Sequence, residues 1–145
     1  MVHRRALLEG AEFANRMGDT VSSNLYLATA NKISESLELH WSSDKGFLIS
    51  ALHSSRPGRS GLDSSIILGA LHADAPYGGV QKTFEIDDDR ILATIPKIVE
   101  HFNQHFPINW VKMNQQGYIL GPALGRYPED IFDGQGSSRG MFYAF

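Results

Sequence analysis

The amino-terminal part of the chain carries two runs of apolar side chains at the three- to four-residue spacing typical of amphipathic helices. The first run predicts a helix over residues 2–17, and Gly18 stands where such a helix would end. The second run predicts a helix over residues 20–41, which Asp19 or Thr20 would cap through a side-chain oxygen. The apolar positions are Val2, Ala6, Leu7, Phe13, Ala14 and Met17 in the first helix, and Val21, Leu25, Ile33, Leu37 and Trp41 in the second.

The middle of the chain combines shorter segments with one further long helix. Residues 46–52 are apolar and bounded by glycine and serine, a pattern that leaves a strand and a buried extended segment equally open. Asp63 and the two serines after it favour a capped short helix through Leu71. The acidic run 87–89 precedes a third long helical pattern, in which Pro96 should bend the helix or delay its start. That pattern consists of Ile91, Leu92, Ile95, Ile98, Val99, Phe102 and Phe106.

After Pro107 the chain is rich in glycine and proline and shows no periodicity, which predicts a long irregular segment. Loops of that length are unusual in a compact domain unless they build a site. The sequence contains no repeat of fixed length and no low-complexity tract. Together these patterns predict an all-α fold in which several helices are joined by long loops.

Composition narrows the class of protein. Hydrophobic residues make up 42% of the 145 residues and charged residues 20%, which is typical of a globular domain and argues against a membrane protein. The net charge is −3 with the basic residues scattered along the chain, which argues against a nucleic-acid partner. The chain has no cysteine, so disulfides and thiolate metal sites are excluded. The amino terminus does not have the pattern of a secretory signal, because its apolar run is short and Glu9 follows at once.

The segment with the most chemical content is Leu124–Asp130, in which an arginine and two acids surround a Tyr-Pro step. Arg126 supplies a planar fork of N–H donors beside the carboxylates of Glu129 and Asp130, and this combination is suited to binding sugar hydroxyls. Charge pairs are also often purely structural. An ion pair between Arg126 and Asp130 that stiffens the loop is therefore the alternative interpretation.

Other candidate groups indicate structure rather than chemistry. His101 and His105 are four residues apart on the third long helix, but the acid of a zinc-protease motif is missing between them, so an ordinary surface pair is expected. The acidic run 87–89 lacks the ligand spacing of a calcium loop, and helix capping explains it better. Trp41 and Trp110 are suited to stacking on sugars, yet such tryptophans more often belong to the core. No metal or cofactor is expected.

The run Ala-Leu-Gly-Arg-Tyr-Pro-Glu-Asp at 123–130, with Gly-x-Gly shortly after it, strongly resembles a loop of fungal and yeast glucoamylases, glycoside hydrolase family 15. Further stretches are similar to the same family in the same order. They are His3–Gly10 with Phe13 and Ala14, Trp41 with Gly46–Ile49, Ser60–Asp63 with Ile67–Gly69, and Phe106–Asn109. The resemblance implies the (α/α)6 toroid of that family, and residues 1–145 would be a middle portion of its catalytic domain, truncated at both ends.

The same resemblance implies a substrate and a set of site residues. In the family, the residues matching Arg126 and Asp130 hydrogen-bond glucose, and those matching Tyr127 and Glu129 help to form the pocket wall. The implied substrates are starch, glycogen and malto-oligosaccharides, from whose non-reducing ends glucose is released by inversion. The family is typically secreted or vacuolar.

Catalysis by inversion requires a carboxylic acid and a separate carboxylate base, roughly 6.5–9.5 Å apart. In the family these lie in a Trp-Glu-Glu run and a Ser-Glu-Gln run, and neither run occurs in the chain. The family also continues into Asn-Pro-Trp where this chain reads Met141–Phe145. We therefore expect the chain to be inactive as a hydrolase when it acts alone.

Two non-catalytic roles remain open on the sequence. One is a carbohydrate-binding remnant that uses Arg126 and Asp130, and the other is a small helical interaction module. In a complete toroid, partners outside the chain would cover part of its apolar helix faces. We therefore expect exposed apolar surface and self-association of the isolated chain. The two faces concerned are Val21, Leu25, Ile33 and Leu37 on one helix, and Ile91, Ile95, Val99 and Phe102 on another.

Overall fold

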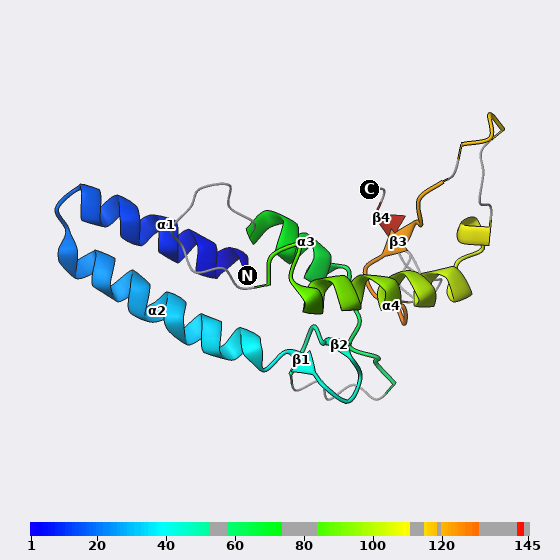
Figure 1. Ribbon diagram of the computed structural model, residues 1–145, viewed down its shortest axis with the longest axis horizontal. Coiled ribbons are helices and arrows are strands. Elements are labelled where there is room, and N and C mark those ends of the chain that lie inside the picture. The colour runs from blue at the N-terminus through cyan, green and yellow to red at the C-terminus, as the bar shows by residue number, and fades with distance from the viewer. Residues whose placement is uncertain (53–57, 74–83, 111–114, 119, 131–141, 144–145) are drawn as a thin grey trace.

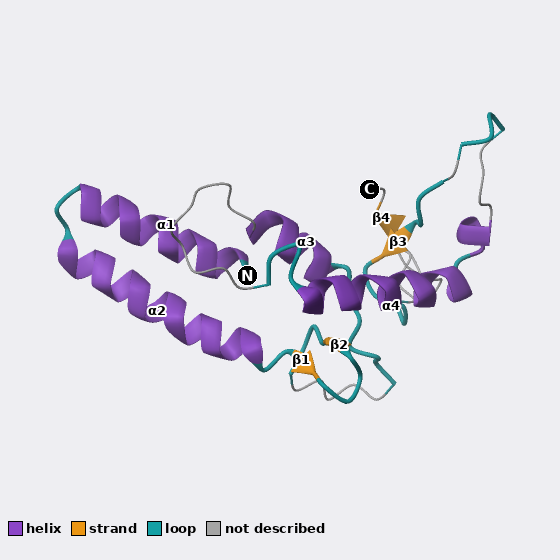
Figure 2. Cartoon of the chain, in the orientation of Figure 1, coloured by secondary structure: helices purple, strands orange, loops and turns teal. Residues whose placement is uncertain are grey.

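A computed structural model describes residues 1–52, 58–73, 84–110, 115–118, 120–130 and 142–143. The described part of the chain is mainly helical, as the sequence predicts (Figures 1 and 2). Its helices are α1 (Val2–Arg16), α2 (Thr20–Glu38), α3 (Ser65–Ala73), α4 (Asp89–His105) and the 3₁₀ helix η1 (Pro107–Trp110). Its strands are β1 (Trp41–Ser42), β2 (Phe47–Leu48), β3 (Leu124–Gly125) and β4 (Phe142–Tyr143).

Helices α1 and α2 form an antiparallel hairpin that extends along one end of the molecule (Figure 1). The turn between them follows the predicted chemistry, because Gly18 takes a positive φ of 81° and Asp19 Oδ1 accepts a hydrogen bond from the amide of Ser22 at 3.0 Å. Within the hairpin the guanidinium of Arg4 is buried and its Nε donates to Ser34 Oγ at 2.5 Å. The predicted first helix and the predicted cap of the second are confirmed.

The second helix is shorter than its apolar pattern predicts. It ends at Glu38, and Trp41 lies in β1, paired antiparallel with Leu48 of β2. Gly46 turns the chain between these strands with a φ of 69°. The segment 46–52, whose type the sequence left open, therefore contains a two-residue strand. The four-residue step to Trp41 was misleading because this side chain packs against the core from a strand rather than from a helix.

The core consists of two clusters, and α4 contributes to both. The first cluster joins α3 and α4 to the hairpin formed by β1 and β2 (Trp41–Leu48), which we call the β2 hairpin. The second joins α4 to the segment around β3. Helix α4 begins at Asp89, with the Asp88 carboxylate accepting from the amide of Arg90 at 2.8 Å, so Pro96 does not delay its start. The members are Leu48, Ile66, Ala70, Phe84 and Ile91 in the first cluster, and Leu62, Ile98, Phe102, Phe106 and Leu124 in the second.

The two apolar faces that the sequence expects to lack partners differ in burial. On α2, Val21 and Leu25 are 79% and 63% exposed, as expected. On α4, Ile91 and Phe102 are fully buried, so the expectation was wrong for this helix. The reason is that α3, the β2 hairpin and the β3 segment together cover α4 within the chain itself.

Candidate functional site

The candidate segment begins with β3. Leu124 is buried in the second core cluster, and β3 pairs antiparallel with β4. Beyond the strand the backbone makes a turn in which the amide of Asp130 donates to the carbonyl of Tyr127 at 3.0 Å. We call residues 123–130 the RYPED loop. Arg126 lies just before this turn, and Asp130 closes it.

Arg126 and Asp130 form an ion pair in which Nε of the arginine donates to Oδ2 at 2.5 Å. The carboxylate side chain is 2% exposed, whereas the arginine side chain is 32% exposed. A buried carboxylate at this distance fixes the plane of the guanidinium fork. The structural ion pair that the sequence offered as an alternative is therefore present, and it leaves about a third of the Arg126 side chain accessible.

Glu129 and Tyr127 connect the RYPED loop to the preceding loop. Glu129 Oε1 accepts from the amide of Ser60 at 2.9 Å, and Oε2 is buried without a hydrogen-bond donor among the residues that the structure describes. The guanidinium of Arg59 lies 3.6 Å from the ring centroid of Tyr127, a cation–π contact. The structure thus brings Arg126 together with Asp130 and Tyr127, whereas Glu129 bonds to the backbone of Ser60.

Several groups that organise the loop were not recognised as such from the sequence. Ser64 was noted only as a helix cap, yet it is fully buried and donates to the RYPED loop through its hydroxyl and its amide. Asn109 was noted only as part of a family motif, yet its side chain makes two hydrogen bonds to the backbone of Ala123. Their role depends on contacts between distant segments, for which the sequence pattern holds no signal.

A hollow of about 230 Å³ lies next to the RYPED loop. Arg59 and Ser60 line it, and the same two residues contact Tyr127 and Glu129. Lys45 also lines the hollow, and its ammonium donates to the carbonyl of Ser60 at 2.7 Å.

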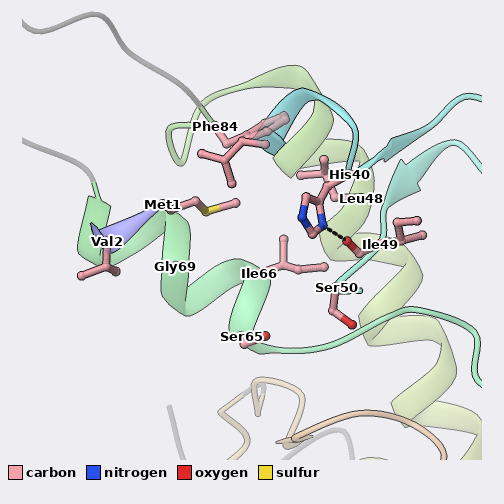
Figure 3. A pocket seen from close by; sticks show the side chains of 11 residues that line it. Met1, Val2, His40, Leu48, Ile49, Ser50, Ser65, Ile66, Gly69 and Phe84 are labelled. Atoms are coloured by element: carbon pink, nitrogen blue, oxygen red, sulfur yellow. Dashed lines mark hydrogen bonds between the residues drawn. The ribbon is translucent and has the colours of Figure 1, made fainter. Parts of the chain in front are cut away.

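A second hollow, of about 220 Å³, lies between α3, the β2 hairpin and the amino terminus (Figure 3). Its walls are mainly apolar, with Met1, Ile66 and Phe84 facing the space. One ring nitrogen of His40, Nδ1, donates to the carbonyl of Ile49 at 2.6 Å. None of the four candidate residues lines either hollow.

The remaining candidates are not brought into a site. His101 and His105 stack with ring centroids 6.4 Å apart, and the Nδ1 atom of each donates to a backbone carbonyl of its own helix. Within the described residues no group of three metal-binding side chains occurs, and no helix there is long and apolar enough to cross a membrane.

The expectation that both tryptophans belong to the core was wrong for one of them. Trp41 is half-buried against the first core cluster. Trp110 is 65% exposed, because η1 turns it away from the second cluster, and its indole N–H donates to the carbonyl of Asn103 at 2.9 Å. Trp110 is therefore a surface residue that caps a carbonyl near the end of α4.

Comparison with known proteins gives consistent results along the whole chain. The sequence profile described as "Glycosyl hydrolases family 15" matches residues 1–144. Among curated proteins, the chain is similar to a glucoamylase of Blastobotrys adeninivorans, with 35% identity over 141 residues that are 97% of this chain and 22% of that protein. It is similar to glucoamylase 1 of Rhizopus oryzae to the same extent, with 35% identity over 97% of this chain and 22% of that protein.

Among solved structures, the chain is similar to a glucoamylase from Saccharomycopsis fibuligera determined at atomic resolution. The TM-score is 0.74 at 24% sequence identity, over 94% of this chain and 28% of that one. The chain therefore has the fold of part of an (α/α)6 barrel, as the sequence predicts. It spans only about a quarter of the length of the proteins that it matches.

Proposed function

The chain belongs to glycosyl hydrolases family 15, and from this membership we propose that it forms part of an enzyme that releases glucose from the non-reducing ends of starch, glycogen or malto-oligosaccharides. Its curated relatives with 35% identity carry the name glucoamylase, which supports hydrolysis of α-linked glucose polymers. The part supplied by this chain is the sugar-binding loop.

The observation that carries this proposal is the ion pair of the RYPED loop. Asp130 is buried and holds the Arg126 guanidinium at 2.5 Å, while part of the arginine side chain stays accessible. A guanidinium that is oriented before the ligand arrives loses less entropy when it binds a sugar hydroxyl. In the proposed assignment Arg126 and Asp130 hydrogen-bond glucose, and Tyr127 and Glu129 form the wall of the pocket.

We further propose that the chain does not hydrolyse its substrate by itself. Inverting hydrolysis needs a carboxylic acid and a carboxylate base on opposite sides of the bond. The Trp-Glu-Glu and Ser-Glu-Gln runs that supply these groups in the family do not occur in the chain. With only one wall of the pocket present, binding is also weak: the site is open to water, and each hydrogen bond to a charged group contributes less than the roughly 1.5–3 kcal/mol it contributes in a dry site.

A titration of the labelled chain with maltose, followed by amide and arginine side-chain resonances, tests this proposal. We expect shifts centred on residues 123–130 with a dissociation constant of about one millimolar or weaker, equivalent to about −4 kcal/mol. Asp130→Asn and Arg126→Lys should reduce the shifts, because one loses the charge and the other the planar fork. Asp44→Asn, which removes an exposed carboxylate from a turn, is the matched control and should leave them unchanged.

Shifts that survive both substitutions in the RYPED loop would contradict the assignment of the sugar site. Binding much tighter than millimolar would contradict the proposal that one wall alone is present. Glucose appearing above a buffer control, and abolished in Arg126→Lys, would refute the absence of catalysis.

A helical interaction module is the second candidate, and a specific observation favours it. Phe13, Met17, Val21 and Leu25 on the α1–α2 hairpin are 63–79% exposed. Side chains of this size are usually buried, and exposed apolar groups gathered on one element mark an association surface. Self-association without any maltose shift would favour this role over the sugar-binding one.

A further inference from the structure

The RYPED loop needs an external anchor because its own secondary structure is short. Strand β3 comprises only Leu124 and Gly125, and β4 is its partner strand. The carbonyl groups of Gly125, at the end of β3, and of Arg126, just after it, need donors, since buried backbone carbonyls are almost always paired. A binding group must also be held to within about 0.5 Å of its productive position. Whatever donates to these carbonyls therefore decides where Arg126 lies.

Ser64 donates to both. Its hydroxyl donates to the carbonyl of Gly125 at 2.5 Å, and its amide donates to the carbonyl of Arg126 at 2.8 Å. The residue has no exposed surface. Two bonds from one residue to consecutive carbonyls fix both the position and the direction of the backbone that carries the Arg126 side chain.

Ser64 is itself rigidly placed by α3. Its carbonyl accepts from the amide of Leu68 at 3.1 Å, as in the first turn of a helix, and the neighbouring Asp63 caps the amide of Ser65 at 2.8 Å. Helix α3 packs in the first core cluster through Ile66 and Ala70. The anchor is thus attached to the core and not to another loop, so it can transmit that rigidity to the RYPED loop.

The residues just before Ser64 support the same loop at its far end. The Ser60 amide donates to Glu129, and Arg59 stacks on Tyr127. On its other side this segment lies against Ile49, and Gly61 permits that approach, because its φ is +92° and a Cβ there would lie 3.0 Å from Ile49 Cγ2. Residues 59–64 therefore form a continuous support along the RYPED loop.

We propose that Ser64 is a positioning residue for sugar recognition, acting through the backbone of Gly125 and Arg126 to hold the Arg126 guanidinium against Asp130. The inference rests on the proposed function for its sugar-binding consequence, but its geometric part concerns Arg126 alone. A second anchor, the Asn109 side chain with bonds of 2.9 and 2.7 Å to Ala123, acts three residues earlier in the loop. It holds the backbone of Ala123, immediately before β3.

The test follows the Nε–H resonance of Arg126 in the whole chain by ¹⁵N NMR. Ser64→Ala removes the hydroxyl bond and should speed exchange of this proton with water about tenfold, the effect expected for loss of a buried hydrogen bond. Arg4, whose Nε donates to Ser34 Oγ in the hairpin, is the internal reference and should not respond. Ser64→Cys keeps a side chain of similar shape that is a weaker hydrogen-bond donor, so it should speed the exchange less. It also provides a second variant in case Ser64→Ala does not fold.

Two controls separate positioning from general loosening. Ser65→Ala changes the next residue, which is exposed, and should leave Arg126 unchanged. Asn109→Ala destabilises the loop from its other end and should change the Ala123 amide more than the Arg126 Nε–H. The proposal is overturned if the Arg126 signal is unchanged in Ser64→Ala, or if the signals of Arg4 and Arg126 change equally.

A maltose titration of the same samples distinguishes this proposal from the proposed function. Suppose that maltose shifts the resonances of the wild type, and that these shifts shrink in Ser64→Ala in proportion to the faster exchange of the Arg126 Nε–H. This result supports both the proposed function and the positioning role of Ser64. A wild type without maltose shifts counts against the proposed function alone, and the Arg126 response still decides whether Ser64 positions the guanidinium. Maltose shifts of full size in Ser64→Ala would overturn the positioning role in sugar recognition.

Discussion

Substitution of Thr94 by valine tests how the β2 hairpin is attached to the longest core helix. Thr94 lies on α4 with no exposed surface. Its hydroxyl donates to the carbonyl of Arg90 at 2.6 Å and accepts from the amide of Leu48 at 2.9 Å. Valine has nearly the same shape but neither hydrogen-bonding function. Thr94→Val therefore leaves the buried Leu48 amide without its acceptor while the packing volume stays the same.

The magnitude follows from this unpaired amide. A buried donor left without a partner costs about 1–3 kcal/mol. Thr94→Ser is the matched control, because it keeps the hydroxyl and removes one methyl group, at a cost of roughly 0.8 kcal/mol for the lost burial. For a chain of this size, 1 kcal/mol shifts the melting temperature by roughly 2–4 °C. We expect the valine variant to be the less stable of the two.

Urea unfolding followed by far-ultraviolet circular dichroism measures the free energies of unfolding, at a concentration low enough that the chain is monomeric. Exchange of the Leu48 amide, followed by NMR, reports the local bond. The reasoning is refuted if Thr94→Val is as stable as Thr94→Ser and the Leu48 amide remains equally protected. That result would mean that the hydroxyl does not connect α4 to β2.

Two further predictions concern pH and association. The hydrogen bond from Arg90 lowers the pKa of Asp88 despite the partial burial of this carboxylate. The ionised carboxylate therefore stabilises the folded chain above its unfolded pKa of about 3.9. This stabilisation is lost as the pH falls through the folded pKa. Between pH 5 and pH 2 the wild type should therefore lose more stability than Asp88→Asn, which keeps a capping side chain; equal losses would contradict the assignment. In sedimentation experiments the average mass of the wild type should rise with protein concentration. A double variant with Val21→Ser and Leu25→Ser should show a smaller rise. Leu71→Ser, which changes an exposed leucine outside the hairpin, is the control and should show the same rise as the wild type. A wild type that stays monomeric at all concentrations would contradict the association.

The elements that local chemistry determines could be predicted from the sequence. Asp19 or Thr20 and the acidic run 87–89 were predicted to cap helices, and Asp19 and Asp88 do so. Gly18 was predicted as a helix end. These predictions succeed because a cap involves only residues two or three positions away. The helix ending at Glu38 was predicted too long, since the apolar step to Trp41 fits a helix and a core-facing strand equally well. Tertiary contacts decided between the two.

The candidate site shows the same division between local and distant contacts. An ion pair between Arg126 and Asp130 was the alternative interpretation of this segment, and the structure contains it. Ser64 lies 61 positions before its partner Gly125, and Asn109 lies 14 positions before Ala123. No periodicity or spacing relates such residues, and only the packing of α3 and η1 beside the RYPED loop brings them together. The sequence therefore singled out the candidate binding groups, whose contact with sugar stays a prediction, and missed the groups that hold them.

The most direct test of the account is a saturation-transfer NMR experiment on maltose mixed with the chain and observed over hours. The account predicts transfer from the protein to the maltose protons, reduced in Asp130→Asn, together with no glucose signal above a buffer control. This result would show a sugar-binding portion of a family 15 domain without its catalytic carboxylates. Absence of transfer at millimolar maltose, or glucose accumulating in the wild type, would contradict it.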